Sequence, residues 1–142
     1  MARLKQAKKI SPIRHKVIYV PIFDRRVLIT SAPKEDWINI AINIVAESDR
    51  DQLNDLEKAY AWTFSENLKY ENTKITAWVL FEERVSPSVI VHENVHVFET
   101  IMSSCGIEQI DEELRAYFSD WLYYEVHSTV TDWKIIDSSG RR

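Results

Sequence analysis

The sequence contains few residues that interrupt, cross-link or anchor a chain. Only two Gly and four Pro occur in 142 residues, so helices and strands are expected to follow one another closely. Cys105 is the single cysteine, which excludes a disulfide framework within the chain and is typical of a reducing compartment. No apolar run approaches the roughly 20 residues that span a bilayer, and the N-terminus lacks the apolar segment of a secretory signal. These absences predict a cytoplasmic chain with no membrane partner.

The composition itself is that of a folded chain. Hydrophobic residues make up 45% of the sequence, including five Trp, six Tyr and five Phe, and charged residues make up 28%. These proportions are typical of globular proteins and provide enough apolar surface for a packed core. The length fits one domain. We find no internal repeat, so residues 16–142 are predicted to form a single domain.

Charge is distributed unevenly along the chain. Residues 1–16 carry six basic side chains and no acid, whereas the other 126 residues carry 12 basic and 22 acidic side chains, a net charge of −10. No aromatic residues alternate with the charges of this arm, so residues 1–15 are predicted to be a flexible, solvated tail. Binding of nucleic acid through the arm is the weaker alternative, and the acidic body is a poor surface for it. The basic residues are Arg3, Lys5, Lys8, Lys9, Arg14 and Lys16.

Alternating, β-branched and aromatic residues predict the strands. Pro21 favours an edge position or a strand end for the first of them. The polar residues 65–73 are predicted to connect the third strand to the fourth. The predicted strands are residues 16–23, 27–30, 59–64 and 74–82.

Capping residues and apolar spacing predict three helices. The first follows Pro33 and ends near Glu47. The second begins at a cap formed by Ser86 or Ser88 and ends before Gly106, which suits a left-handed residue at a helix C-terminus. Asp111 is predicted to cap the third, which extends to Val126. The chain from Ser128 onwards is predicted to be an irregular tail, pinned to the body by its apolar residues.

The second helix contains an HExxH motif, His92-Glu93-Asn94-Val95-His96. Residues four apart lie on one helix face, roughly 6 Å apart, so both imidazoles can bind one Zn²⁺ ion. The metal lowers the pKa of its bound water to about 7, and Glu93 is placed to accept the proton as general base. Ionisable groups are costly to bury in such an apolar stretch unless they are paired or bind a metal. A chance pair of histidines is the less favoured interpretation.

A third protein ligand must come from outside the motif. No His or Gly extends it, because Glu99 and Met102 occupy those places. The acids at the start of the third helix, which is predicted to fold back antiparallel, are the nearest suppliers. Asp111 is better explained as the cap. We predict Glu113 as the ligand, because its helix face also carries a small residue and two polar groups, Ala116, Tyr117 and Asp120. Glu112 is the second choice. Its face also carries Arg115 and Ser119, which are typical of a solvent-exposed surface.

Two further ionisable residues, His127 and Glu99, are candidates for the same site. His127 lies 14 residues after Glu113, about 21 Å along a straight helix, so it is not predicted to bind the same ion. Glu99 faces the histidine side of its helix. It is predicted either to orient an imidazole or to be a solvated, helix-paired acid.

These motifs resemble those of the gluzincins, and more closely the minimal gluzincin domains found as small proteins in bacteria and their phages. The resemblance rests on VIVHENVHVF (residues 89–98) and on GIEQIDEELRAY (residues 106–117), and covers mainly residues 74–125. It implies an α+β, zincin-like fold, with a small twisted mixed sheet, an HExxH helix and a following antiparallel ligand helix. It supports Glu113 as ligand, and implies that an edge strand, here residues 74–82, binds extended peptide. The His or Tyr that larger gluzincins supply from a second domain has no clear counterpart, and Tyr117 or Tyr124 are the candidates.

The function predicted from these residues is a zinc-dependent metallopeptidase that acts on a peptide or protein substrate. Its metal ligands are His92, His96 and Glu113, and Glu93 activates the water. The alternative is a catalytically weak or inactive protein of the same fold that binds peptides or proteins as a regulatory module. The intact Glu93 favours catalysis, because a structural zinc does not need it.

Overall fold

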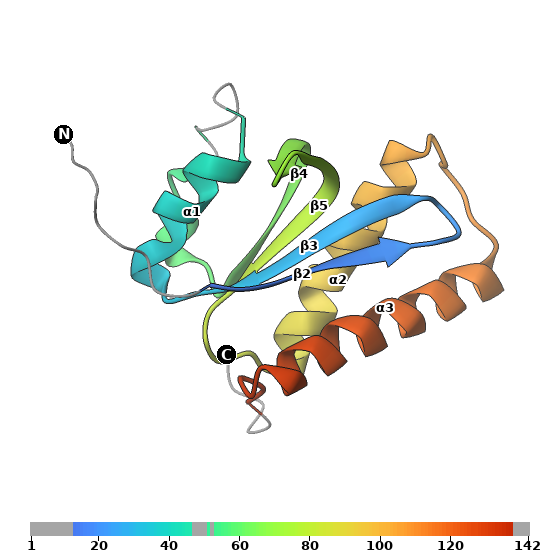
Figure 1. Ribbon diagram of the computed structural model, residues 1–142. Helices are drawn as coiled ribbons and strands as arrows, with labels where there is room; N and C mark the ends of the chain where they lie inside the picture. The colour runs from blue at the N-terminus through green and yellow to red at the C-terminus, as the bar shows by residue number, and fades with distance from the viewer. Residues whose placement is uncertain (1–12, 47–50, 52, 138–142) are drawn as a thin grey trace.

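A mixed four-stranded sheet separates two layers of helices in the computed structural model, which describes residues 13–46, 51 and 53–137. Helix α1 covers one face of the sheet, and α2 and α3 cover the other (Figure 1). The predicted α+β class with a mixed sheet is therefore confirmed. The strands are β2 (Arg14–Val20), β3 (Arg25–Ser31), β4 (Ala61–Tyr70) and β5 (Thr73–Phe81), and the helices are α1 (Trp37–Ile44), α2 (Pro87–Ser104) and α3 (Glu112–Asp132), with 3₁₀ turns at Lys34–Asp36 and Leu56–Lys58.

Most of the predicted basic arm lies outside the described residues. Its last two residues, Arg14 and His15, already belong to β2, so the ordered domain begins before residue 16. Among the described residues, no helix is long and apolar enough to cross a membrane.

The strand order is β2-β3-β5-β4, with β3 and β5 parallel and the other pairs antiparallel. The prediction that residues 74–82 form an edge strand is wrong, because β5 is central and β4 is the edge. The sequence of β5 contains the reason. Residues 77–81 are all fully buried, and such a continuous apolar run is typical of a strand covered on both faces.

The connection predicted between the third and fourth strands is also wrong. Strand β4 continues through the polar stretch to Tyr70, and only Glu71 and Asn72 form the turn. Both residues have positive φ, 49° and 66°, which is the backbone of a two-residue hairpin turn. A bulge between Ser65 and Leu68 interrupts the alternation, and this irregularity hides the strand from a period-two pattern.

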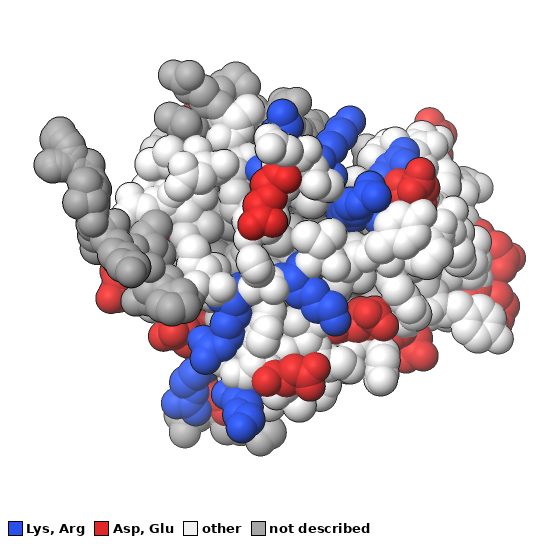
Figure 2. Space-filling model, in the orientation of Figure 1, with Lys and Arg blue, Asp and Glu red and all other residues white. Residues whose placement is uncertain are grey.

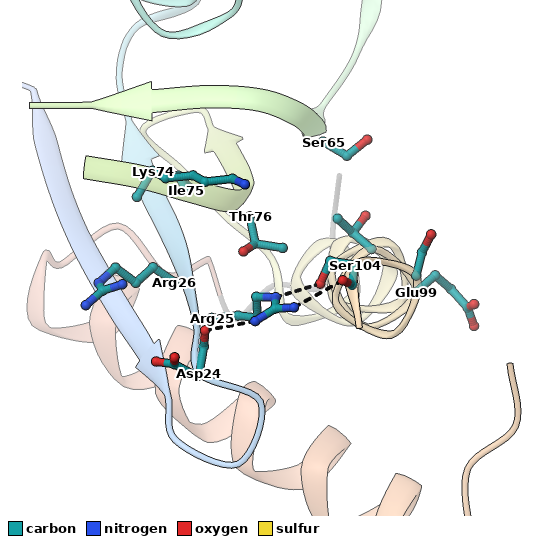
Figure 3. A pocket seen from close by; sticks show the side chains of 11 residues that line it. Asp24, Arg25, Arg26, Ser65, Lys74, Ile75, Thr76, Glu99 and Ser104 are labelled. Carbon is teal, nitrogen blue, oxygen red and sulfur yellow. Dashed lines mark hydrogen bonds between the residues drawn. The ribbon is translucent and has the colours of Figure 1, made fainter. Parts of the chain in front are cut away.

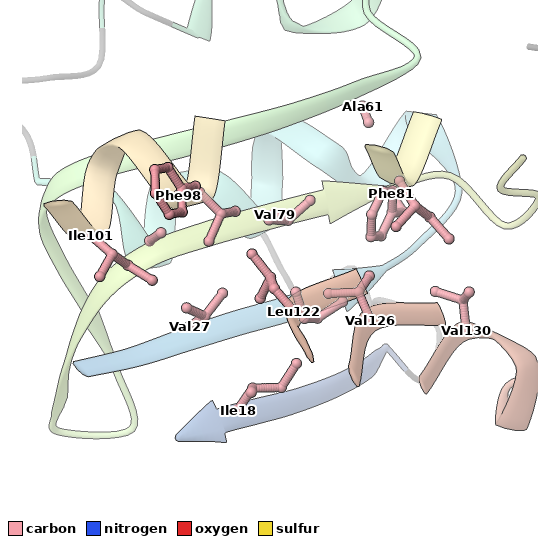
Figure 4. Packing of buried hydrophobic residues seen from close by; sticks show 14 of the residues in the cluster. Ile18, Val27, Ala61, Val79, Phe81, Phe98, Ile101, Leu122, Val126 and Val130 are labelled. Atoms are coloured by element: carbon pink, nitrogen blue, oxygen red, sulfur yellow. The ribbon is translucent and has the colours of Figure 1, made fainter. Parts of the chain in front are cut away.

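Each face of the sheet has its own core. On the α1 side, Trp37 is fully buried, and Phe64 stacks on Trp78 with 4.5 Å between ring centroids. On the other side, strand residues pack against α2 and α3 (Figure 4). This second core contains, among others, Ile18, Val27, Val79, Phe98, Leu122 and Val126. It fixes α2, which carries the HExxH motif, against the sheet.

Helix α2 begins and ends at the predicted residues. The hydroxyl of Ser86 accepts a hydrogen bond from the Val89 N–H, and Pro87 occupies the first helical position. At the other end Gly106 has a φ of 70°, and the Ile107 N–H donates to the Met102 carbonyl at 2.9 Å. This is a Schellman motif, in which a left-handed residue closes the helix.

Helix α3 begins as predicted and ends later. Asp111 caps it by accepting from the Glu113 and Leu114 N–H groups. The β-branched residues from Ser128 have low helix propensity, but burial of Thr129 and Val130 extends the helix to Asp132. The following chain is pinned to the body as predicted, since Val85 donates to the Ile135 carbonyl at 2.8 Å.

Asn94 is buried in α2, and neither side-chain amide atom has a hydrogen-bond partner among the described residues. An unsatisfied buried polar group costs about 1–3 kcal/mol. We therefore expect Asn94→Leu, which keeps the size, to raise the free energy of unfolding by about 1–2 kcal/mol. Asn94→Asp should lower it, because it buries a charge. Denaturant titration measures both changes, and destabilisation by Asn94→Leu would contradict the unsatisfied amide.

Candidate metal and catalytic site

Helix α2 brings the two motif histidines together. Their ring centroids are 5.1 Å apart, with the ring planes at 73°, and both side chains are exposed. The i, i+4 spacing produces this arrangement, because two residues one turn apart project from the same face. Two imidazoles are therefore adjacent and open to solvent, an arrangement that suits two nitrogen donors to one metal ion.

Glu93 lies on the inner side of the helix, between the histidines and the sheet. Its side chain is only 7% exposed, and its Oε2 is 4.0 Å from Nε2 of His92. The hydroxyl of Thr63, in the edge strand β4, donates to the other oxygen, Oε1, at 2.6 Å. This bond fixes one oxygen of the carboxylate and leaves the other, Oε2, on the side of His92.

Thr63 was not predicted as a site residue. The pattern in residues 59–64 predicts a strand there, but the position of that strand relative to α2 depends on the sheet order. No local signal in the sequence distinguishes Thr63 from the other hydroxyl residues of β4. It joins the site because the strand that carries it is the edge strand facing α2.

The predicted third ligand lies at the exposed start of α3. Asp111, Glu112 and Glu113 are all exposed there. Figure 2 shows acidic side chains gathered at the end of the molecule where α3 begins. Within the described part of the chain, no three His, Cys, Asp or Glu side chains are arranged so that they could hold a metal ion. Two of the predicted donors are thus adjacent, and the carboxylate of Glu113 is not gathered with them.

The helix face that approaches α2 differs from the predicted one. Arg115 lies over the ring of Phe98, with 4.4 Å from Cζ to the centroid, and is 3.9 Å from a carboxylate oxygen of Glu99. Phe118 also packs on Phe98. The face of Glu113, which carries Ala116, Tyr117 and Asp120, remains exposed. Packing against the large ring of Phe98, rather than close approach at a small residue, positions this part of α3.

His127, Glu99, Tyr117 and Tyr124 are the other candidates for the site. His127 is half-buried and stacks on Tyr123 with 5.3 Å between centroids. Glu99 is exposed and paired with Arg115, which corresponds to the second of its two predicted roles. Tyr117 and Tyr124 are 70% and 66% exposed. Either hydroxyl could act only on a substrate that is bound beside α3.

Comparison of the chain with models of protein families, with curated proteins and with solved structures gives no match.

Proposed function

We propose that this chain is a zinc-dependent metallopeptidase, as its HExxH motif predicts. One observation supports this most: Glu93 is buried beside two exposed histidines and held by Thr63 of the edge strand. A structural zinc site does not require a carboxylate that is not a metal ligand. A general base, in contrast, has to be fixed beside the metal and kept from bulk solvent.

In this proposal His92 and His96 would hold the ion, and Glu113, which does not lie with them in the structure, would supply the third protein ligand that the motif predicts. Zinc, when bound, acts as a Lewis acid that acidifies water and polarises a peptide carbonyl. Glu93 accepts a proton from the attacking water through the oxygen that faces the histidines. The carboxylate then passes this proton to the leaving amine. Thr63 keeps the carboxylate oriented through both transfers.

The substrate would be an extended peptide added to the sheet beside β4. The side of β4 that faces away from β5 has one backbone bridge among the described residues, between Leu68 and Val45. The stretch Ala61–Ser65 therefore offers backbone N–H and C=O groups next to Thr63 and Glu93. A peptide bound there by strand addition would have its backbone beside the general base. The peptide-binding edge strand in this proposal is β4, and not residues 74–82, which the resemblance implied.

Digestion of a peptide mixture tests the proposal. The chain supplied with zinc is expected to generate new peptide termini, detected by mass spectrometry. A chelator should stop the cleavage, and an excess of zinc should restore it, because the ion takes part in the reaction. A chain that binds zinc and produces no new termini from any peptide pool would contradict the peptidase function.

One observation favours the alternative, a peptide-binding module of the same fold. Among the described residues, no third metal ligand lies with the two histidines. The exposed edge of β4 would serve binding as well as cleavage. The two functions differ in the products of the digestion, since a binding module protects the bound peptide and releases it intact.

A further inference from the structure

A cavity of about 820 Å³ lies beyond the catalytic residues, between the sheet and the C-terminal half of α2 (Figure 3). The sheet forms one wall, with the starts of β3 and β5 and with Ser65 of β4, and α2 forms the other wall with Glu99, Thr100, Ser103 and Ser104. Hydroxyl groups are frequent in this lining. Such a cavity suits a polar side chain better than an apolar one.

The cavity lies further along β4 and α2, the two elements that carry Thr63 and Glu93. On β4, Ser65 follows Thr63 on the same strand face, about 7 Å further along. On α2, Thr100 follows Glu93 by seven residues, which places it on nearly the same helix face and about 10 Å further along. A peptide added to β4 repeats its side chains on one face every 7 Å or so. A residue two or three positions from the cleaved bond would thus point into the cavity.

Basic side chains dominate the charge of the lining. Lys74 has no ion-pair partner among the described residues, whereas Arg26 lies over the ring of Tyr19 at 5.5 Å and points away from α2 in Figure 3. Arg25 donates only to the Ser104 hydroxyl and to carbonyl groups, including that of Ser104 at 3.1 Å. Its charge is therefore not cancelled by a carboxylate.

The two carboxylates of the lining already have partners. Asp24 accepts a hydrogen bond from the Tyr19 hydroxyl at 2.9 Å, and this bond is the main cause of the raised pKa of Tyr19. Glu99 pairs with Arg115, and its carboxylate points away from Arg25 and Lys74 in Figure 3. The hydroxyl of Tyr19 does not cancel the charge of Asp24, but Arg25 and Lys74 together outweigh this one carboxylate. The lining is therefore positive, although the chain beyond residue 16 has a net charge of −10.

We propose that this cavity binds an acidic side chain, Asp or Glu, of the peptide substrate, two or three residues from the cleaved bond. Lys74 and Arg25 attract the carboxylate, and the hydroxyls of Thr76 and Thr100 donate hydrogen bonds to it. The inference rests on the proposed peptidase function for the identity of the ligand. It adds the substrate class that this chain prefers.

Binding to a variant that does not cleave tests the pocket separately from catalysis. Glu93→Gln, loaded with zinc, would be titrated with fluorescent peptides that differ only by Glu or Gln at one scanned position. We expect the Glu peptide to bind about fivefold more tightly at one such position, the effect of one exposed charge pair. Added salt should reduce the difference. Lys74→Glu should abolish it, and Lys74→Gln should weaken it.

Lys16→Glu is the matched control, because it makes the same charge change at an exposed site on β2, the opposite edge of the sheet. It should leave the preference for Glu intact. Equal binding of both peptides at every position, or equal loss in the Lys16 and Lys74 variants, would overturn the pocket. Cleavage by the wild-type chain without a preference for acidic peptides would leave the peptidase function and remove this inference. A preference for acidic peptides without cleavage would support the pocket and contradict the peptidase function.

Discussion

Replacing Glu93 with Gln is expected to lower kcat/KM for peptide cleavage by about 10³-fold, since a positioned general base contributes roughly 10²–10⁴-fold. The amide keeps the shape of the side chain and can still accept a hydrogen bond from Thr63, but it cannot accept the proton of the water. Zinc content should remain that of the wild type, because Glu93 is not a ligand in the proposal. Kinetic assays and metal analysis of the same preparation measure both quantities.

Two further variants make this result specific. Glu108→Gln, in the exposed connection between α2 and α3, removes a carboxylate outside the site and should leave cleavage unchanged. Thr63→Val removes the hydrogen bond to Glu93 and should lower kcat by about tenfold with a small change in KM, whereas Thr63→Ser should restore most of the rate. Cleavage by Glu93→Gln at the wild-type rate would exclude Glu93 as the base.

The sequence predicts the ends of α2 and the start of α3 correctly, because local interactions determine them. Ser86 with Pro87, Gly106 and Asp111 each act within one helical turn, so their residue types are informative alone. The order of the strands and the end of α3 depend on burial by distant segments. The pairing of β5 with β3, 50 residues earlier, and the burial of Val130 are such effects.

Some features of the candidate site likewise follow from local sequence, and others depend on distant segments. The approach of His92 to His96 follows from helical spacing, and the structure confirms it. The contribution of Thr63 comes from another strand, and its bond to Glu93 depends on the sheet order. The face of α3 that packs on α2 depends on Phe98 and Phe118, two large rings whose contact was not predicted. Glu113 as a ligand stays a prediction from the motif.

The second large effect is expected on zinc binding. His92→Ala or His96→Ala should weaken zinc binding at least about a hundredfold, since each ligand of a zinc site contributes roughly 3 kcal/mol of the binding free energy. Glu113→Ala should weaken it strongly as well, and Glu112→Ala should not. His127→Ala is the matched control, because its ring stacks on Tyr123 rather than lying with the other two. Competition with a chromophoric chelator measures the affinities, and mass spectrometry measures the zinc per chain.

Three results would revise the site. Loss of zinc in Glu112→Ala, with full affinity in Glu113→Ala, would move the third ligand by one residue. Full affinity in both variants would remove the start of α3 from the site. Wild-type affinity in His92→Ala would mean that the motif does not bind the metal, and would remove the basis of the proposed function.

The single parallel pairing in the sheet has a consequence for folding. Strands β2 and β3 form one local hairpin, and β4 and β5 form another, each closed by a short turn. Only the pairing of β3 with β5 joins the two hairpins within the sheet, and it closes a loop of about 50 residues. Because contacts between distant segments form late, the hairpins are expected to precede their union. Thr63, Glu93 and the two histidines all lie in the second hairpin and the helix that follows it, so they belong to one continuous segment. The later union with β2 and β3 completes the core beneath α2.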